Sequence, residues 1–409
     1  MNILLISHYA GSSTLGMLFR PYYLGKEWIK QGHRLCVVSA SYSHLRNNQP
    51  NVPKDFTVEI IEEIKYIWLK TPRYSSNGIK RFLSMIVFVL KLYKYKHRII
   101  QEIKPNAVIA SSTYPFDIYP AFSIAKKSKA KLCYEVRDLW PLTPMIIGGF
   151  SKWNPFIMLM QAGENFACKK SDVIVSVLDN AKTYLMEHGM AAEKFHYIPN
   201  GFVMSEYLDR GNLPENLDKF ISLLKQQNKI LVGYAGGFKP SNAVHVLIEA
   251  ANKLKTNKDI AFILVGKGIE YDRLNKIIKD NNMENVFIFE PINKNSVLSF
   301  LRKMDILYTG GVNSELHKHG ISPIKLVDYM LSAKPFVLSA NLAENNWVTR
   351  FSIGRIVPAE DSYSVANAIE NLIKCTEQER IEMGKKGFDY AYNNLNYEIL
   401  SKNFIQALS

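Results

Sequence analysis

Short apolar runs of strand length alternate with helical patterns along almost the whole chain, and this alternation constrains the fold more than any other feature. Residues 2–7 form one apolar run, a turn follows, and residues 18–30 have a helical pattern that ends at Gly32. A second apolar run occupies residues 35–40. A strand, a helix and another strand in this order are typical of an open parallel α/β sheet.

The alternation begins afresh near residue 229. Further strands are predicted at residues 107–111, 131–136 and 172–177, and then at residues 229–235, 261–265, 285–289, 305–309, 335–338 and 353–357. A chain of 409 residues exceeds one ordinary hydrophobic core. We therefore expect an α/β protein with two doubly wound domains, which meet near residue 200.

Charge is distributed unevenly between the two halves. Residues 1–200 contain 26 Lys and Arg against 14 Asp and Glu, whereas residues 201–409 contain 25 against 23. The basic first half predicts an anionic partner there, such as a membrane surface or an anionic substrate. Zinc-finger spacings, aromatic RNA-binding motifs and arginine-rich tails are absent from the sequence, so no nucleic acid partner is expected.

The cysteines and the first residues add two further expectations. Cys36, Cys133, Cys168 and Cys375 lie far apart in apolar or helical contexts, which predicts free thiols in a reducing compartment and no metal site. The apolar run at residues 2–7 has no basic region before it, so no signal peptide is expected.

Residues 79–103 form a long helical pattern with two interpretations. Residues 82–90 are strongly apolar, and five basic or His side chains crowd into residues 91–98. The apolar part is far shorter than the ~20 residues that span a bilayer. It is either a helix buried against the sheet or an interfacial helix on anionic lipid, and the surrounding positive charge favours a membrane-facing first domain.

A glycine-rich loop leads into the most informative segment, residues 320–338. Ser322 offers an N-cap hydroxyl, and Pro323 suits the first helical position. Lys325 and Asp328 follow three residues apart on one face of this helix. A helix start with a nearby lysine attracts a diphosphate, and the carboxylate suits a neighbouring ribose. The alternative is a capped helix whose Lys and Asp pair in solvent.

Other candidate ligand-binding residues follow predicted strands, where parallel sheets bind ligands. In the second half they are two glycines that allow a close backbone approach, a lysine that can reach a phosphate, and a third glycine. In the first half they are a histidine, a glycine and a charged pair. The set is Gly236, Gly237, Lys239, Gly266, His8, Gly16, Arg137 and Asp138. Each of these glycines could instead serve only to turn the chain.

The order of these segments resembles the retaining glycosyltransferases of family 4 over nearly the whole chain. The resemblance implies a GT-B fold, with two Rossmann-like domains facing a central cleft. The implied domains are residues 1–200 for the acceptor and residues 201–389 for the nucleotide-sugar donor, with a helix at residues 390–409 that packs back on the first. In this family two glutamates flank the donor; Asp328 matches the second, and Gly320 replaces the first.

The resemblance also implies roles for individual residues. Ser322, Pro323, Ile324 and Lys325, with Lys239, would hold the diphosphate, and Asp328 would hold the ribose. Gly16, Gly236, Gly237 and Gly266 would approach the donor. Asp138 would activate the acceptor, with His8 and Arg137 nearby. Transfer would proceed with retention, without a metal or another cofactor.

Two stretches, residues 16–24 and 39–46, resemble a narrower group, the N-acetyl-L-fucosaminyl-type transferases of bacterial O-antigen and capsule assembly. This implies a UDP-type donor of N-acetyl-L-fucosamine and an acceptor sugar on undecaprenyl diphosphate. It also implies a cytoplasmic protein, peripheral on the inner face of the bacterial plasma membrane. A sugar-nucleotide 2-epimerase of the same fold, or a non-catalytic membrane-docking scaffold that binds nucleotide sugar, are the alternatives.

Overall fold

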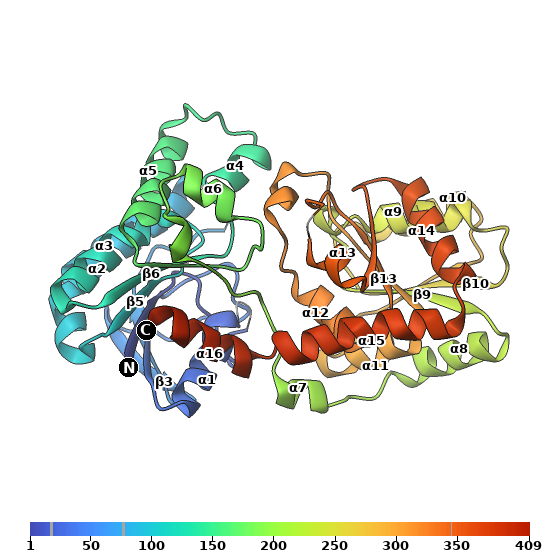
Figure 1. Cartoon of the computed structure of the whole chain (residues 1–409), viewed down its shortest axis with the longest axis horizontal. Coiled ribbons are helices and arrows are strands. Elements are labelled where there is room, and N and C mark those ends of the chain that lie inside the picture. Colours follow the sequence, from blue (N-terminus) through green and yellow to red (C-terminus); the bar gives the residue numbers. More distant parts are fainter. Residues whose placement is uncertain (17–18, 76–77, 345) are drawn as a thin grey trace. The chain divides into compact units, whose positions relative to one another are not determined.

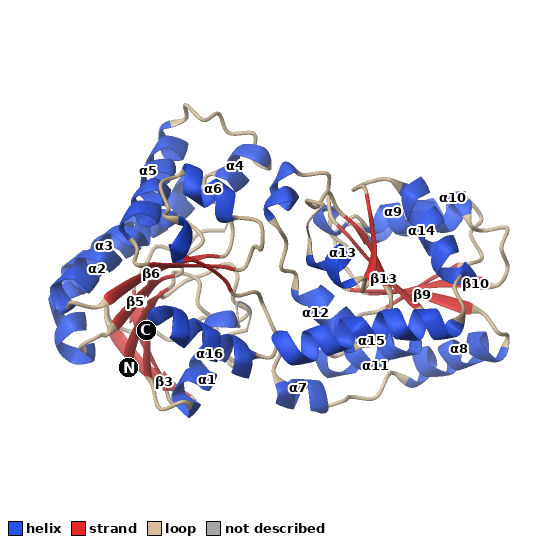
Figure 2. Ribbon diagram, viewed as in Figure 1, coloured by secondary structure: helices blue, strands red, loops and turns tan. Residues whose placement is uncertain are grey.

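The computed structural model describes residues 1–16, 19–75, 78–344 and 346–409, and it divides the chain into two compact units (Figure 1). The first unit contains Met1–Pro199 and Tyr397–Ser409, and the second contains Asn200–Asn396. Each unit is described separately below. Figure 2 shows helices on both faces of the strands in each unit. Leu18, the first residue of one predicted helix, lies outside the described residues.

The sheet of the first unit has eight strands in the order β3-β4-β2-β1-β5-β6-β7-β8. All neighbours pair in parallel except β3 and β4, which are antiparallel at one edge. The strands are β1 (Asn2–Ile6), β2 (Arg34–Ala40), β3 (Thr57–Ile61), β4 (Ile64–Leu69), β5 (Ala107–Ala110), β6 (Lys131–Val136), β7 (Val173–Ser176) and β8 (Phe195–Tyr197). The central strands are buried on both faces, which explains their unbroken apolar sequences.

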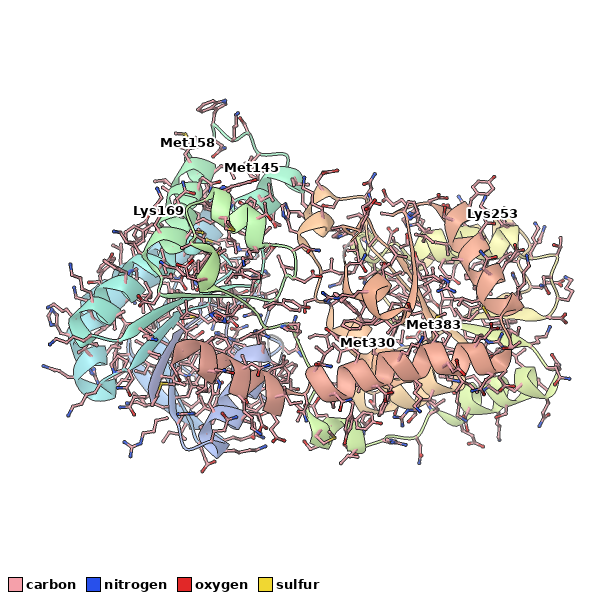
Figure 3. All side chains as sticks on the ribbon, viewed as in Figure 1. Met145, Met158, Lys169, Lys253, Met330 and Met383 are labelled. Atoms are coloured by element: carbon pink, nitrogen blue, oxygen red, sulfur yellow. The ribbon has the colours of Figure 1, made fainter. Side chains whose placement is uncertain are left out.

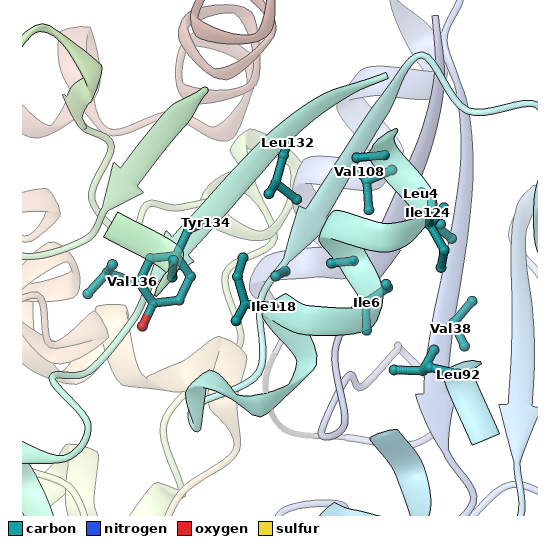
Figure 4. Close-up of a cluster of buried hydrophobic side chains, with 14 of the residues drawn as sticks. Leu4, Ile6, Val38, Leu92, Val108, Ile118, Ile124, Leu132, Tyr134 and Val136 are labelled. Carbon is teal, nitrogen blue, oxygen red and sulfur yellow. The ribbon is translucent and has the colours of Figure 1, made fainter. Parts of the chain in front are cut away.

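Helices of the first unit cover this sheet and close its core. They are α1 (Arg20–Lys30), α2 (Ile79–Ile103), α3 (Ile118–Ser128), α4 (Leu142–Ile146), α5 (Pro155–Lys170), α6 (Lys182–Glu187) and α16 (Tyr397–Leu408), with 3-10 turns η1 (Pro115–Asp117) and η2 (Ala192–Lys194). Figure 4 shows Leu92 of α2 and Ile124 of α3 among strand residues such as Val38 and Val108. Because α2 buries one face in this core, the buried-helix interpretation is correct for that face.

The C-terminal helix α16 belongs to the first unit. It packs on α1, where the Trp28 indole donates to the Ser401 carbonyl at 3.2 Å and stacks edge-on against Phe404. This helix begins at Tyr397 rather than at residue 390. The reason is that α15 (Glu377–Asn394) continues through residue 390 as part of the second unit, where Ala391 is buried in the core.

The second unit has a fully parallel six-stranded sheet in the order β11-β10-β9-β12-β13-β14. Its strands are β9 (Ile230–Ala235), β10 (Ile260–Val265), β11 (Val286–Phe289), β12 (Ile306–Gly310), β13 (Phe336–Ser339) and β14 (Gly354–Val357). The chain winds outward from β9 in one direction and from β12 in the other. The point where the order reverses therefore lies between β9 and β12, which is where ligands bind in such sheets.

The remaining helices of the second unit cover both faces of this sheet. They are α7 (Met204–Leu208), α8 (Glu215–Gln226), α9 (Val244–Lys253), α10 (Tyr271–Asp280), α11 (Lys294–Lys303), α12 (Ile324–Leu331), α13 (Trp347–Phe351) and α14 (Ser362–Lys374), with 3-10 turns η3 (Pro240–Asn242) and η4 (Glu315–His319). Helix α12 follows β12, and the Tyr329 hydroxyl on it donates to the Tyr308 carbonyl at 2.7 Å. This bond holds α12 against β12.

Candidate functional site

A cavity of about 390 Å³ lies at the carboxyl ends of β9, β10 and β11 in the second unit. Its walls come from the loops after these strands and from α11 and α12. The lining residues are Ala235, Gly236, Gly237, Val265, Gly266, Lys267, Pro291, Ile292, Val297, Leu301, Lys325, Asp328 and Tyr329. Five of the residues predicted to bind a ligand are thus brought together: Gly236, Gly237, Gly266, Lys325 and Asp328.

Lys325 supplies the buried positive charge of the cavity, whose wall also contains the exposed Lys267 paired with Glu290 at 3.6 Å. Its ammonium donates to the Tyr234 hydroxyl at 3.0 Å and lies 4.3 Å from the centre of the Tyr234 ring. Burial lowers the pKa of Lys325 to about 8. The protein therefore holds this ammonium where solvent stabilises it poorly, so an anion that enters the cavity gains a strong partner.

Asp328 lies one turn further along α12. Burial raises the pKa of its carboxyl to about 7. Its carboxylate accepts no hydrogen bond from any residue that the structure describes, so the solvent pair with Lys325 is not formed. A carboxylate left open toward a cavity can accept hydrogen bonds from two neighbouring hydroxyl groups of a ligand.

Two glycines are required by the geometry of the cavity wall. Gly236 and Gly266 have φ angles of +151° and +158°, which side-chain-bearing residues rarely adopt. A Cβ atom on Gly266 would lie 1.9 Å from the Gly236 carbonyl oxygen, and one on Gly236 would lie 3.0 Å from the Lys325 ammonium. Both glycines therefore keep the backbone close to the space beside Lys325.

The other residues predicted for this site lie outside the cavity walls. Lys239 is exposed, and Ile324 is 56% exposed. The predicted N-cap is wrong: Pro323 occupies the N-cap position of α12, and Ser322 makes no capping bond. The Ser322 hydroxyl instead accepts from the Asn200 N–H at 2.9 Å, and the Asn200 amide donates to the Ser322 carbonyl at 2.7 Å.

Gly320 has a φ of +105°, so a side chain at this position would strain the backbone. This geometry agrees with the absence of a carboxylate at the position. Gly16, in the first unit, also has a left-handed φ of +70°, and a Cβ there would lie 2.7 Å from the Asn47 side chain.

His8 follows β1 and is fully buried. Its Nδ1 lies 2.7 Å from the Tyr114 hydroxyl, and the rings of Tyr9 and Phe88 pack against it. Burial, reinforced by the charge of Arg46, lowers the pKa of His8 well below its ordinary value. The imidazole is therefore neutral, and its Nε2 has no hydrogen-bond partner among the described residues.

Arg137 and Asp138 follow β6 at the same edge of the first sheet. Asp138 accepts hydrogen bonds from the Leu139 N–H at 2.9 Å, the Trp140 indole at 3.1 Å and the Thr143 hydroxyl at 2.6 Å. These bonds hold the loop into α4. Arg137 makes no hydrogen bond among the described residues, and burial lowers the pKa of its guanidinium, an effect that the neighbouring Glu135 opposes.

Sequence analysis did not identify Tyr234 or the buried pair of Arg20 and Glu135. Tyr234, the partner of Lys325, is the second-to-last residue of the buried strand β9, and its apolar surroundings in the sequence predict a core residue. A buried ion pair joins Arg20 Nε to Glu135 Oε1 at 2.8 Å, and the Arg20 Nη2 also donates to the Ile198 carbonyl at 2.8 Å. The only available signal was that Arg20 and Glu135 are charged residues beside apolar runs.

Two Rossmann-like units with parallel sheets define the GT-B class of fold, and two family models match the chain. The model described as Glycosyltransferase Family 4 matches residues 20–206, and the model described as Glycosyl transferases group 1 matches residues 216–389. Together they cover most of both units, and the chain is a glycosyltransferase of the family 4 type. Comparison with curated protein sequences finds no match.

Solved structures resemble the chain over its full length. HepE from Anabaena, in complex with UDP, is 15% identical, with a TM-score of 0.66 over 100% of this chain and 99% of its own. Sucrose-phosphate synthase from Thermosynechococcus elongatus is 14% identical, with a TM-score of 0.71 over 99% and 98%. An E. coli trehalose-6-phosphate structure with UDP-2-fluoro glucose is 11% identical, with a TM-score of 0.72 over 99% and 98%. At these identities the likeness concerns the fold.

Proposed function

We propose that the protein is a retaining glycosyltransferase that moves a sugar from a UDP-linked donor to a lipid-linked glycan. The observation that carries this proposal is the cavity of the second unit, where the Lys325 ammonium and the open Asp328 carboxylate lie one helical turn apart. The structures with UDP and UDP-2-fluoro glucose support a uridine nucleotide as its ligand.

In this proposal the second unit binds the donor. Lys325 neutralises the diphosphate as it leaves, Asp328 holds the ribose hydroxyls, and the backbones of Gly236, Gly237 and Gly266 approach the nucleotide. The resemblance to family 4 adds Lys239, Ser322, Pro323 and Ile324 to the diphosphate site, although these residues lie outside the walls of the cavity. A fixed cation at a developing charge lowers the barrier of such a step, so transfer needs no metal.

The first unit binds the acceptor in this proposal, at the edge that carries His8, Arg137 and Asp138. The acceptor is a sugar on undecaprenyl diphosphate, the donated sugar is N-acetyl-L-fucosamine, and the product enters bacterial O-antigen or capsule synthesis. The basic first half supports a protein that is peripheral on the inner face of the bacterial plasma membrane. Among the described residues, no helix is long and apolar enough to cross a bilayer.

Thermal unfolding with a panel of nucleoside diphosphates and nucleotide sugars tests the donor. A ligand at 100 times its Kd stabilises the protein by about 2.7 kcal/mol, so UDP and the correct UDP-sugar should raise the Tm and ADP and GDP should not. Transfer to a short-chain lipid-linked acceptor then reports the anomeric configuration of the product. Absence of any shift with UDP, or isomerisation of the donor without acceptor, would contradict the proposal.

Donor affinity should depend on pH in a bell shape. The Lys325 pKa of about 8 means that Lys325 loses its positive charge above this pH in the empty cavity, and the Asp328 pKa of about 7 means that the Asp328 carboxylate is protonated below it. Affinity for a UDP-sugar, whose diphosphate does not titrate in this range, should therefore peak between these values. Calorimetric titration at several pH values measures this profile. In Asp328→Asn the loss of affinity at low pH should disappear, and the loss at high pH should remain. A wild-type affinity that does not change with pH would contradict the prediction.

A further inference from the structure

Large apolar side chains are exposed where α2 begins and where α4 connects to α5 in the first unit. Trp153 is 72% exposed, Ile79 is 86% exposed and Ile147 is 67% exposed. Single exposed apolar residues are normal in proteins, but here six gather in two short segments. We call them the apolar surface: Ile79, Leu83, Ile147, Phe150, Trp153 and Leu159.

Contacts beneath the apolar surface join its two segments. The Phe82 ring of α2 lies 5.1 Å from the Phe156 ring at the start of α5, measured between centroids. Phe82 and Phe156 also both pack near Phe116. Figure 3 labels Met145 on α4 and Met158 at the start of α5, beside the connection between these helices. The exposed residues above this aromatic cluster therefore belong to one region of the first unit.

The sequence around both segments of the apolar surface is basic, and the acidic side chain beside them, Asp138, accepts hydrogen bonds from Trp140 and Thr143. Residues 64–101 and residues 139–163 contain no Asp or Glu. Lys80 and Arg81 lie in the first turn of α2, and the Lys152 ammonium lies 5.3 Å from the centre of the Trp153 ring. Apolar side chains, a tryptophan and lysines without acidic neighbours match the interface of an anionic bilayer, where each basic group contributes about 1 kcal/mol.

The apolar surface also adjoins the edge of the sheet that carries the predicted acceptor residues. The Arg81 guanidinium lies 5.6 Å from the ring centres of both Tyr9 and Trp140. Tyr9 follows His8 after β1, and the Trp140 indole donates to Asp138 after β6. A lipid held at the apolar surface would therefore present its head group beside this edge.

We infer that the apolar surface inserts into the interfacial region of an anionic lipid bilayer and positions the first unit on it. This inference rests on the proposed function, because a lipid-linked acceptor is presented there. Insertion is interfacial, with the side chains of Trp153, Ile147 and Ile79 entering the boundary between head groups and acyl chains. The basic residues contact lipid phosphates around them.

Vesicle sedimentation with the full-length protein tests the inference. Wild-type protein should bind vesicles of phosphatidylcholine mixed with phosphatidylglycerol, bind pure phosphatidylcholine more weakly, and lose affinity at high salt. Ile147→Ser combined with Trp153→Ser should reduce binding to the anionic vesicles about tenfold or more, because two large apolar side chains are removed. The matched control combines Leu223→Ser with Ile269→Ser, two exposed apolar residues of the second unit, and should bind like wild type.

Three outcomes would overturn the inference. The first is equal vesicle binding by the two double variants, and the second is equal binding of the wild type to anionic and neutral vesicles. The third is a change in the oligomeric mass of Ile147→Ser/Trp153→Ser without a change in its lipid binding. That result would assign the apolar surface to a contact with a second copy of the chain. The UDP-induced shift in Tm and transfer to a short-chain acceptor should persist in Ile147→Ser/Trp153→Ser. Loss of the UDP shift in wild-type protein would instead contradict the proposed function.

Discussion

Replacing Lys325 with methionine should reduce transfer by roughly 100- to 1,000-fold, the usual cost of removing one fixed group that stabilises a developing negative charge. Methionine keeps the apolar stem that packs near Tyr234 but cannot carry the charge. The rate should fall at saturating donor, because the leaving diphosphate carries more charge in the transition state than in the bound donor. Initial rates with a short-chain acceptor measure the effect.

The same variant should be at least as stable as the wild type in the absence of ligand. The lowered pKa of Lys325 shows that the folded protein disfavours its charged form, and a neutral side chain removes that cost. Lys276→Ala, an exposed lysine on α10 outside the cavity, is the matched control and should keep full activity. Wild-type turnover by Lys325→Met under saturating donor would remove Lys325 from the mechanism.

Replacing Arg20 with alanine should destabilise the first unit by about 3–5 kcal/mol, because it leaves the buried Glu135 carboxylate without the cation to which it is directly hydrogen-bonded. Both side chains are almost completely buried, at 3% and 1% exposure. Burial alone would raise the pKa of Glu135, but Arg20 and Arg137, together with the Ser111 hydroxyl, hold it below its ordinary value. The urea midpoint of the first unfolding transition measures the loss.

A second substitution separates the ion pair from the packing of Arg20. Glu135→Gln in the Arg20→Ala background removes the unpaired charge and should restore a large part of the stability. Arg34→Ala, at the exposed start of β2, should leave the midpoint unchanged. Mutations of surface ion pairs usually change the free energy of unfolding by less than about 1 kcal/mol. A change that small in the single Arg20→Ala variant would contradict this account.

Strand and helix positions were predictable where hydrophobic patterns are long and unbroken. The helix predicted at residues 79–103 coincides with α2, and each predicted strand matches an observed strand to within one residue at either end, whereas β3, β4 and β8 were not predicted. The β3–β4 hairpin was missed because its turn residues, Glu62 and Glu63, have left-handed φ angles that usually require Gly or Asn. Contacts from Lys26 and Ser13 to Glu62, remote in sequence, hold this turn.

The candidate site was predictable where its residues share one helical face and where glycines directly follow a predicted strand, as at Gly236, Gly237 and Gly266. Lys325 and Asp328 share a helical face, so their spacing alone brings them to the cavity. Tyr234 and the wall residues Pro291 and Ile292 reach it through the parallel pairing of three strands, which no local pattern encodes. Ser322 was assigned to a helix cap because its true partner, Asn200, lies 122 positions earlier in the chain.

The course of the backbone has a practical consequence for dissecting the enzyme. The second unit is one uninterrupted stretch, and its two ends meet where the Phe202 N–H donates to the Leu395 carbonyl at 2.9 Å. In the sequence the second unit is an insertion into the first unit, whose last helix packs on Trp28. A gene fragment for residues 200–396 therefore encodes the second unit as one continuous chain, whereas a fragment that stops at residue 199 lacks the helix that completes the first unit.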